Sequence, residues 1–522
     1  MLRGILTVGI WTMASRLLGF ARDVLIADRL GTGLVADAFF VALKLPNLFR
    51  RLFGEGAFNA AFVPAFAGTL ASFGREPARR LAGEVASVLA VWLAGITVLG
   101  IVFMPQLMVV LAPGFAALPA KLALTVTLTR IAFPYLMLMC LAALFGGMLN
   151  GLDRFAAAAG APVLFNVFLI GALLLPPIAM LPTTGHLLAA GLVLSGFAQL
   201  GVLVLAVRIA GMAPPCGWPQ LTPGVRTVLR RMGPGVIGAG VTQLNVAVDT
   251  VIASLLPAGT VSVLYYADRV DQLPLGVIGA AVGTAILPLL SRQVRAGDKG
   301  LAITTLNHGI EYALVLTLPA ALALSVAGGP IMSVLFARGA FDALAAARSA
   351  QALAAYAVGL PAYVLAKVFA PAFFARGDTG TPVKIGLVAV ALNLVLNLAF
   401  MRPLGHVGPP LATSIAAAFN AAALAVLLYW RGYFRPDATL GRRLARMVLA
   451  AGAMALALLV LDPVLFAVAG GRSVLRALAL VLLVGTGLVA YGAAGQALGA
   501  FDLLELARSL LRRRFAAAKS RG

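Results

Sequence analysis

The sequence has few charged residues, few histidines and almost no cysteine. Of its 522 residues only 11% are charged, while 61% are hydrophobic. Soluble domains carry about 25% charged residues, so this chain has too little polar surface to be water-soluble or disordered. The two cysteines, Cys140 and Cys216, are too few for a disulfide framework and are expected to be reduced. What remains is a membrane protein that crosses the bilayer many times.

The motifs of common enzyme classes are also missing. The three histidines, His186, His308 and His406, lie near the ends of apolar stretches and form no HExxH pattern. There is neither a GxxxxGK[ST] loop for ATP nor a GxSxG elbow for acyl transfer. We therefore predict that the protein is not an enzyme and has no metal site.

Apolar stretches of about 20–30 residues divide the chain, and each can cross a hydrocarbon core of about 30 Å as a helix. The fold class expected is therefore an all-α integral membrane protein. The second stretch is the least apolar, and Arg16 and Arg22 in the first argue against a cleaved signal peptide. Fourteen transmembrane helices are predicted, centred near residues 18, 50, 96, 135, 166, 197, 240, 276, 318, 360, 392, 420, 456 and 487.

The basic residues are distributed unevenly between alternate connections. One set of connections holds 25 of the 40 Lys and Arg residues, and the other set, to which Lys121 is assigned, holds 7. Because positive residues stay on the cytoplasmic side, both termini are predicted to be cytoplasmic. Most of the net charge of +22 then faces anionic lipid, so we expect no nucleic-acid partner.

An internal duplication organises most of the chain. At an offset of 226, the segment that starts at Asp23 matches the segment that starts at Asp249, and Gly33 matches Gly259. At an offset of 227, Pro134 matches Pro361 and Asn166 matches Asn393. Two six-helix lobes related by a pseudo-two-fold axis along the membrane normal are expected, with a central cavity. The predicted divisions are an N-lobe (1–210), a C-lobe (224–431), two appended spans (443–500) and a basic amphipathic cytoplasmic tail (501–522).

Charged residues inside the expected spans are candidates for a site, because such residues usually face a cavity or a partner. For Asp23, Asp37, Asp268 and Asp271 we favour ion pairs between helices over direct contact with a ligand. The arginines outnumber the acids nearby, and planar guanidinium groups suit bidentate contacts to phosphate. We therefore favour an anion-binding site over a purely structural network for this set: Arg16, Arg22, Arg50, Arg51 and Arg269.

Several motifs together resemble the MurJ (MviN) family, whose members are lipid II flippases of the multidrug/oligosaccharidyl-lipid/polysaccharide (MOP) exporter superfamily. The resemblance runs through most of the chain. It rests on SRLLGFARD (15–23), DAFF (37–40), LPNLFRR (45–51), EGAF (55–58), AFVP (61–64), YYADR (265–269) and TPVK (381–384).

The resemblance implies substrate-binding roles for four arginines and supporting roles, in the cavity or in ion pairs, for six neighbours. The four that would bind the diphosphate are Arg16, Arg22, Arg50 and Arg269. The supporting residues are Asp23, Asp37, Asn47, Arg51, Glu55 and Asp268.

The implied function is transport of lipid II, an undecaprenyl-diphosphate-linked disaccharide-pentapeptide, for peptidoglycan synthesis. The polar head would cross from the cytoplasmic to the periplasmic leaflet of the bacterial inner membrane by alternating access, while the appended helices would hold the polyprenyl tail. Membrane lipids and the cell-wall synthesis machinery are the other expected partners.

Two questions stay open at this point. A related exporter of another lipid-linked oligosaccharide or of drugs is the alternative function, although a pump for cationic drugs would need an acidic site rather than arginines. No cofactor is firmly predicted. Some family members bind sodium in the C-lobe, but Lys367 in the tenth expected span would repel a cation. Coupling to the membrane potential or to an ion is left open.

Overall fold

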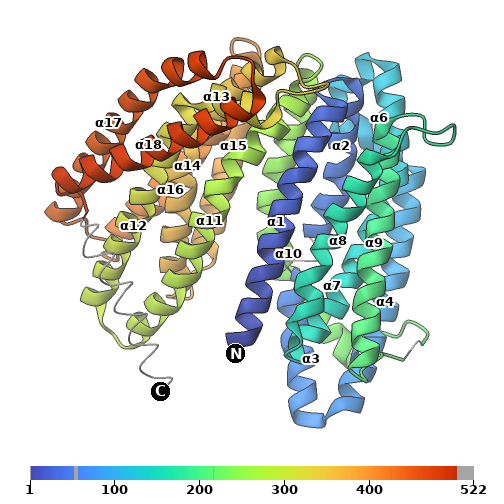
Figure 1. The fold of residues 1–522 in the computed structure, drawn as a ribbon. Coiled ribbons are helices and arrows are strands. Elements are labelled where there is room, and N and C mark those ends of the chain that lie inside the picture. The colour runs from blue at the N-terminus through green and yellow to red at the C-terminus, as the bar shows by residue number, and fades with distance from the viewer. Residues whose placement is uncertain (1, 52–56, 216, 502–522) are drawn as a thin grey trace. The chain divides into compact units, whose positions relative to one another are not determined.

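The computed structural model describes residues 2–51, 57–215 and 217–501 (Figure 1). Its regular structure is helical, apart from one isolated β-bridge between Ile178 and Leu181. The elements of the first half are α1 (Leu2–Leu30), α2 (Leu34–Phe49), α3 (Ala57–Phe73), α4 (Arg75–Val102), α5 (Met104–Leu111), η2 (Pro113–Ala117), α6 (Pro119–Ala132), α7 (Tyr135–Gly151), α8 (Phe155–Leu174) and α9 (Thr184–Ile209). Those of the second half are α10 (Pro223–Leu255), α11 (Thr260–Arg295), α12 (Lys299–Val326), α13 (Gly328–Phe336), α14 (Ala343–Phe374), α15 (Gly380–Phe400), η3 (Gly405–Val407), α16 (Gly408–Trp430), α17 (Ala438–Ala469) and α18 (Ser473–Ala497).

The all-helical membrane architecture predicted from composition is confirmed. Among the described residues, ten helical segments are long and apolar enough to cross a membrane. They coincide with ten of the fourteen predicted spans, and the total of fourteen stays a prediction. The ten segments are Arg75–Val102, Pro119–Gly151, Phe155–Leu174, Thr184–Ile209, Lys299–Val326, Ala343–Phe374, Gly380–Phe400, Gly405–Trp430, Ala438–Ala469 and Ser473–Ala497.

The four remaining predicted spans lie in the parts of the two repeats that contain more polar residues. The first and the seventh are α1 and α10, and the eighth is α11. Near the second span, expected around residue 50, α2 ends at Phe49 and α3 begins at Ala57. Residues 52–56 between them lie outside the described residues, so this span stays a prediction.

The order of helix lengths supports the duplication. The long helix α4 is followed at once by the short α5, and the long α12 is followed in the same way by the short α13. Repeat-related prolines act differently in the two halves. Pro134 separates α6 from α7, whereas Pro361 lies inside the continuous helix α14.

Several helices begin at a side chain that caps exposed backbone N–H groups. The Asp298 carboxylate accepts a hydrogen bond of 2.8 Å from Leu301 N, and that of Asp437 accepts one of 2.7 Å from Leu440 N. The Thr222 hydroxyl has the same role for Val225 N at the start of α10. Each cap of this kind contributes about 1 kcal/mol to the stability of its helix. These caps fix the residues at which α10, α12 and α17 begin.

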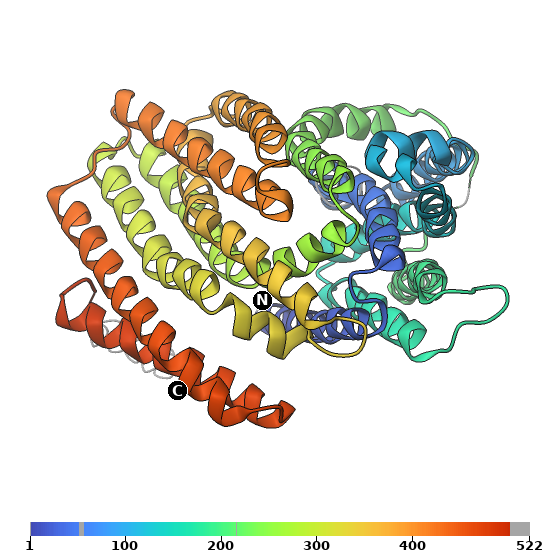
Figure 2. The same cartoon turned by 90° about the horizontal axis from the view of Figure 1, so that it is seen from above.

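Contacts divide the chain into two compact units. The first comprises residues 1–262 with 338–342, and the second comprises 263–337 with 343–522. Grouping by contacts does not test the lobe boundaries inferred from the repeat, which stay a prediction, and residues 502–522 of the expected tail lie outside the described residues. Within the second unit α17 and α18 lie side by side, and α17 packs against α12 (Figures 1 and 2).

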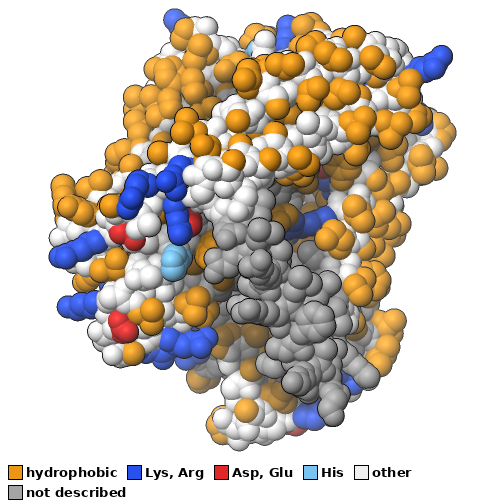
Figure 3. Space-filling model, turned by 60° about the vertical axis from the view of Figure 1, so that its left-hand side comes forward, with side chains coloured by type: hydrophobic (Ala, Val, Ile, Leu, Met, Phe, Trp, Pro, Cys, Tyr) orange, Lys and Arg blue, Asp and Glu red, His pale blue; other side chains and the backbone are white. Residues whose placement is uncertain are grey.

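Hydrophobic side chains cover much of the surface that Figure 3 shows. Leu456, Val460, Val481 and Leu488 on α17 and α18 are each at least 60% exposed. Exposed apolar side chains in such numbers are suited to lipid rather than to water. The one cysteine among the described residues, Cys140, is buried and reduced.

Candidate functional site

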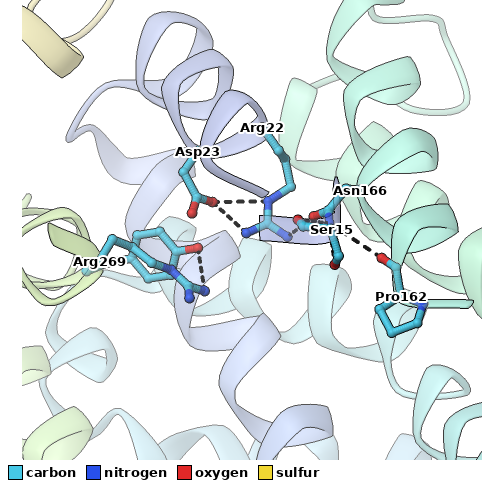
Figure 4. A network of polar contacts seen from close by, with 7 residues as sticks. Ser15, Arg22, Asp23, Pro162, Asn166 and Arg269 are labelled. Carbon is cyan, nitrogen blue, oxygen red and sulfur yellow. Dashed lines mark hydrogen bonds and ion pairs between the residues drawn. The ribbon is translucent and has the colours of Figure 1, made fainter. Parts of the chain in front are cut away.

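Arg22 is at the centre of a buried polar network in the first unit (Figure 4). Its Nε and Nη2 donate to Asp23 Oδ1 at 3.0 and 2.6 Å, and its Nη1 donates to Asn166 Oδ1 at 2.9 Å. The guanidinium group also stacks on Phe165, 5.0 Å from the ring centroid. Arg22 is therefore paired with the adjacent carboxylate. A buried pair of this kind is held in place because breaking it leaves an uncompensated charge.

Asn166 on α8 connects this network to α1. Its Nδ2 donates to the backbone oxygen of Ser15 at 2.9 Å and to that of Pro162 at 3.4 Å, while its Oδ1 accepts from Arg22. A Cβ atom at Gly19 would lie 3.6 Å from Asn166 Oδ1, so α1 and α8 approach closely here. The amide thus uses both its donor and its acceptor to orient the arginine.

Arg50 lies at the wall of a cavity in the same unit. The cavity is open to the surface, has an empty volume of about 630 Å³, and lies between α3, α7, α8, α9 and Arg50, the residue that follows α2. Arg50 is half-buried, and its Nε donates to Asn47 Oδ1 at 3.3 Å. Pro162 lines the same cavity and also accepts from Asn166. A short chain of contacts therefore leads from Arg22 through Asn166 to the cavity that Arg50 borders.

Asp37 forms a second buried cluster, with four donors. Lys121 Nζ and Gly259 N donate to its Oδ2 at 2.6 and 2.7 Å, and Ser262 N and Oγ donate to its Oδ1 at 2.9 and 2.6 Å. Gly259 has a φ of +89°, and a Cβ there would lie 2.7 Å from Thr32 O. Only glycine fits this close approach. The cluster joins α2 and α6 to Gly259 and Ser262 at the start of α11.

Lys121 corrects an expectation from the sequence. The charge count assigned it to a connection, whereas the structure places it inside α6, where it is 2% exposed. Its ammonium group pairs with Asp37 and lies 4.0 Å from the centroid of the Phe115 ring. A lysine can be buried in this way because the carboxylate and the ring face replace its hydration.

In the second unit, Arg269 on α11 is half-buried beside Tyr265. Its Nη2 donates to the Tyr265 hydroxyl at 3.0 Å, and its guanidinium lies 4.8 Å from the centroid of that ring. The neighbouring Asp268 accepts a short hydrogen bond from Gln272 on the same helix. Spacings of four residues bring both partners onto the same helix face. Tyr265 therefore helps to orient the guanidinium group of Arg269.

The other predicted site residues differ in their surroundings. Arg16 is exposed and makes no ion pair among the described residues. Arg51 is exposed at the end of the turn that follows α2. Glu55 lies outside the described residues. The sequence analysis thus named residues around Arg22, Arg50 and Asp37. That these residues surround one central cavity stays a prediction.

Sequence reasoning missed several residues that complete these groups. Asn166 was noticed only as a repeat match, and Lys121 only as a charge in a connection. Asn59, Asn150 and Gln199 in the cavity wall carry no charge, so the search for intramembrane charges could not find them. An additional search for carboxamides within apolar helices would have found them.

The described residues offer little that would suit a metal ion. No group of three or more His, Cys, Asp or Glu side chains among them lies close enough to hold one. Lys367 is exposed on α14, and its Nζ would lie 2.7 Å from a Cβ atom at Gly279 on α11. Its positive charge would oppose a cation at this part of the second unit.

Comparison with known proteins decides the family. The family model described as "Lipid II flippase MurJ" matches residues 26–474. The chain belongs to the lipid II flippase MurJ family. A protein of Rhizobium meliloti (strain 1021) named "Probable lipid II flippase MurJ" is 43% identical over 511 residues, which cover 97% of this chain and 95% of that protein.

Solved structures of related fold agree with this assignment. A lipid II flippase MurJ in an inward closed conformation matches with a TM-score of 0.77 and 23% identity, covering 94% of this chain and 98% of that one. An inward-facing MATE transporter of the MOP superfamily matches with a TM-score of 0.67 and 14% identity over 82% and 98% of the two chains. At these identities the likeness concerns the fold alone. The MurJ family is a family of membrane transporters and not of enzymes, and this chain is a multi-pass membrane protein.

Proposed function

We propose that this protein is a lipid II flippase of the bacterial inner membrane, which moves undecaprenyl-diphosphate-disaccharide-pentapeptide from the cytoplasmic to the periplasmic leaflet. The observation that carries the proposal is the family match over residues 26–474. The chemistry of the first unit agrees with it, since Arg22 and Arg50 are connected to one polar cavity rather than spread over unrelated surfaces. A diphosphate is a ligand that suits guanidinium groups.

The proposal includes a fold of about fourteen transmembrane helices, with two six-helix lobes around a central cavity and two appended helices. Both termini would lie in the cytoplasm, as the distribution of Lys and Arg predicts. Labelling single cysteines introduced before α1 and after α18, in intact cells, tests this orientation. Access from the periplasm to either position would overturn it.

The proposed cycle begins with a cavity open to the cytoplasm. Arg16, Arg22, Arg50 and Arg269 would attract the diphosphate, whose negative charges reduce the repulsion among the arginines and allow closure on the cytoplasmic side. Rocking of the lobes then opens the cavity to the periplasm, as in transporters built from two repeats. The polyprenyl tail stays in the lipid, so only the polar head crosses.

No cofactor forms part of the proposal, and sodium has no assigned role because of Lys367. The energy would come from the membrane potential or from another ion. Collapsing the potential and each ion gradient separately in proteoliposomes identifies which of them drives transport. The cell-wall synthesis machinery is proposed as the consumer of the product on the periplasmic side.

Depletion of the protein in its native host provides the main test. If the protein is the flippase, lipid II accumulates in the inner leaflet and peptidoglycan synthesis stops. If lipid II still reaches the outer leaflet at the normal rate, the proposal is wrong. Export of another lipid-linked oligosaccharide is the alternative, and accumulation of that lipid instead of lipid II would favour it.

A further inference from the structure

The cavity that Arg50 borders is unusual in its lining. Among the described residues of the wall Arg50 is the one that carries a charge, and three carboxamides accompany it: Asn59, Asn150 and Gln199. The rest of the wall consists mostly of alanine, glycine and other side chains without charge. A site that binds only an anion is expected to have more positive charge. A site for an apolar lipid tail is not expected to contain three amide side chains.

The carboxamides are placed to bind a ligand. Asn59 Oδ1 is buried and has no hydrogen-bond partner among the described residues, so a donor from a ligand would satisfy it. Gln199 is 1% exposed, and its Nε2 donates to Ser195 O at 3.1 Å, which fixes the orientation of its amide. Buried amides held in this way select ligands by hydrogen bonds rather than by charge.

Glycine and alanine residues in the wall leave the cavity open. A Cβ atom at Gly146 would have only the Ala158 Cβ nearby, at 3.8 Å, so this position opens into the cavity. At Gly147 a Cβ would lie 3.4 Å from Asn59 Oδ1, so glycine lets α3 approach α7 there. The wall positions that are alanine or glycine (Ala142, Ala143, Gly146, Gly147, Ala158 and Ala161) therefore leave room for a ligand beside Arg50.

We infer that this cavity is a sugar subsite of the proposed flippase, and this inference rests on the proposed function. The hydroxyl and N-acetyl groups of the sugar bonded to the diphosphate hydrogen-bond to Asn59, Asn150 and Gln199, while Arg50 at the wall holds the diphosphate. Asn150 lies near the end of α7, next to a connection predicted to be cytoplasmic. The subsite is therefore reached from the leaflet in which the substrate is made.

The subsite gives the protein a means of discrimination. Undecaprenyl diphosphate without sugars carries the charge that the arginines recognise, but it would leave the buried Asn59 Oδ1 without a hydrogen-bond donor. A site built to hydrogen-bond a ligand strongly disfavours an analogue that lacks those groups. The carboxamides thus favour the loaded lipid over the bare carrier.

The test compares the affinities of two lipids for the purified full-length protein. Native mass spectrometry measures binding of lipid II and of undecaprenyl diphosphate to wild type, Asn59→Leu and Gln199→Leu. Each variant is expected to lower the affinity for lipid II by about tenfold, the effect of removing one hydrogen bond to a buried polar group. The affinity for undecaprenyl diphosphate is expected to stay the same, which also shows that the variants fold. Arg50→Ala should weaken the binding of both lipids.

A further variant tests whether the ligand occupies the cavity. Gly146→Leu fills the cavity from α7, whereas Gly171→Leu makes the same change on α8 at a position where a Cβ meets nothing within 4 Å. The first should reduce binding of lipid II selectively, and the second should not.

The results of these experiments distinguish failure of the sugar-subsite proposal from failure of the flippase proposal. Unchanged affinity for lipid II in the Asn59, Gln199 and Gly146 variants, or an equal loss for both lipids in all three, overturns the sugar subsite and leaves the flippase proposal standing. A wild-type protein that binds neither lipid contradicts the proposed function itself.

Discussion

Asp37 and Lys121 form an ion pair of 2.6 Å in which both side chains are almost fully buried. The pair does not stand alone, because Ser262 and Gly259 fill the remaining acceptor positions of the carboxylate. Its position ties α2 and α6 of the first half to the start of α11. We regard Asp37 as a structural residue that fixes this junction rather than as a ligand of the substrate.

Removing one partner of this pair should destabilise the protein. Asp37→Asn or Lys121→Met leaves the other charge buried and unpaired, at a cost of about 3–5 kcal/mol. The double variant should recover most of this loss. Thermal unfolding of the purified protein measures both effects, and complementation of a depleted strain should fail to a similar degree for the two single variants. Normal growth with Lys121→Met alongside failure with Asp37→Asn would assign Asp37 to the substrate instead.

Arg22 should tolerate lysine poorly. The three hydrogen bonds that its guanidinium gives to Asp23 and Asn166 diverge in a fork that one ammonium group cannot reproduce. Hydrogen bonds to charged groups are worth about 1.5–3 kcal/mol each, so Arg22→Lys should lose complementation almost as fully as Arg22→Ala. Arg50→Lys should retain partial activity, because charge matters more at the cavity wall. Full growth with Arg22→Lys would show that charge dominates at Arg22 as well.

Arg269 should be essential for transport but not for insertion. Arg269→Ala is expected to abolish complementation while the protein reaches the membrane in normal amounts. Tyr265 provides a graded comparison, since Tyr265→Phe removes the hydroxyl acceptor and keeps the ring, whereas Tyr265→Ala removes both contacts. The phenylalanine variant should be nearly normal and the alanine variant impaired. Wild-type growth with Arg269→Ala would remove this arginine from the mechanism.

We expect the stability of the protein to depend on pH through Asp378, which lies between α14 and α15. Hydrogen bonds from Thr381 and Arg431 lower the pKa of its carboxyl group to about 2 from 3.8. Because the pKa of the folded state lies below that of the unfolded state, the stabilisation is present above about pH 4 and is lost as the pH falls towards 2. The melting temperature of Asp378→Asn should therefore lie below that of wild type by a constant amount between pH 5 and 8. The difference should shrink below pH 4, and a difference that grows there would contradict the assignment.

The sequence predicted the apolar helices, while the roles of the site residues stay a prediction. Apolar length alone located ten segments that can cross a membrane, because a helix in lipid must satisfy its own backbone hydrogen bonds. The span around residue 50 stays a prediction, because residues 52–56, between α2 and α3, lie outside the described residues. The sequence placed Lys121 in a connection, because a charge count cannot detect a carboxylate that approaches from another helix.

By itself, the sequence determined that this is an all-helical membrane protein with an internal repeat and with arginines where charge is costly. These properties depend on composition and spacing, which are local. Only the tertiary structure decided that Arg22 faces Asp23 and Asn166, that Lys121 neutralises Asp37, and that Arg50 borders a cavity rich in carboxamides. Such pairings join residues up to 144 positions apart, and the packing of helices against one another, rather than any local pattern, brings them together.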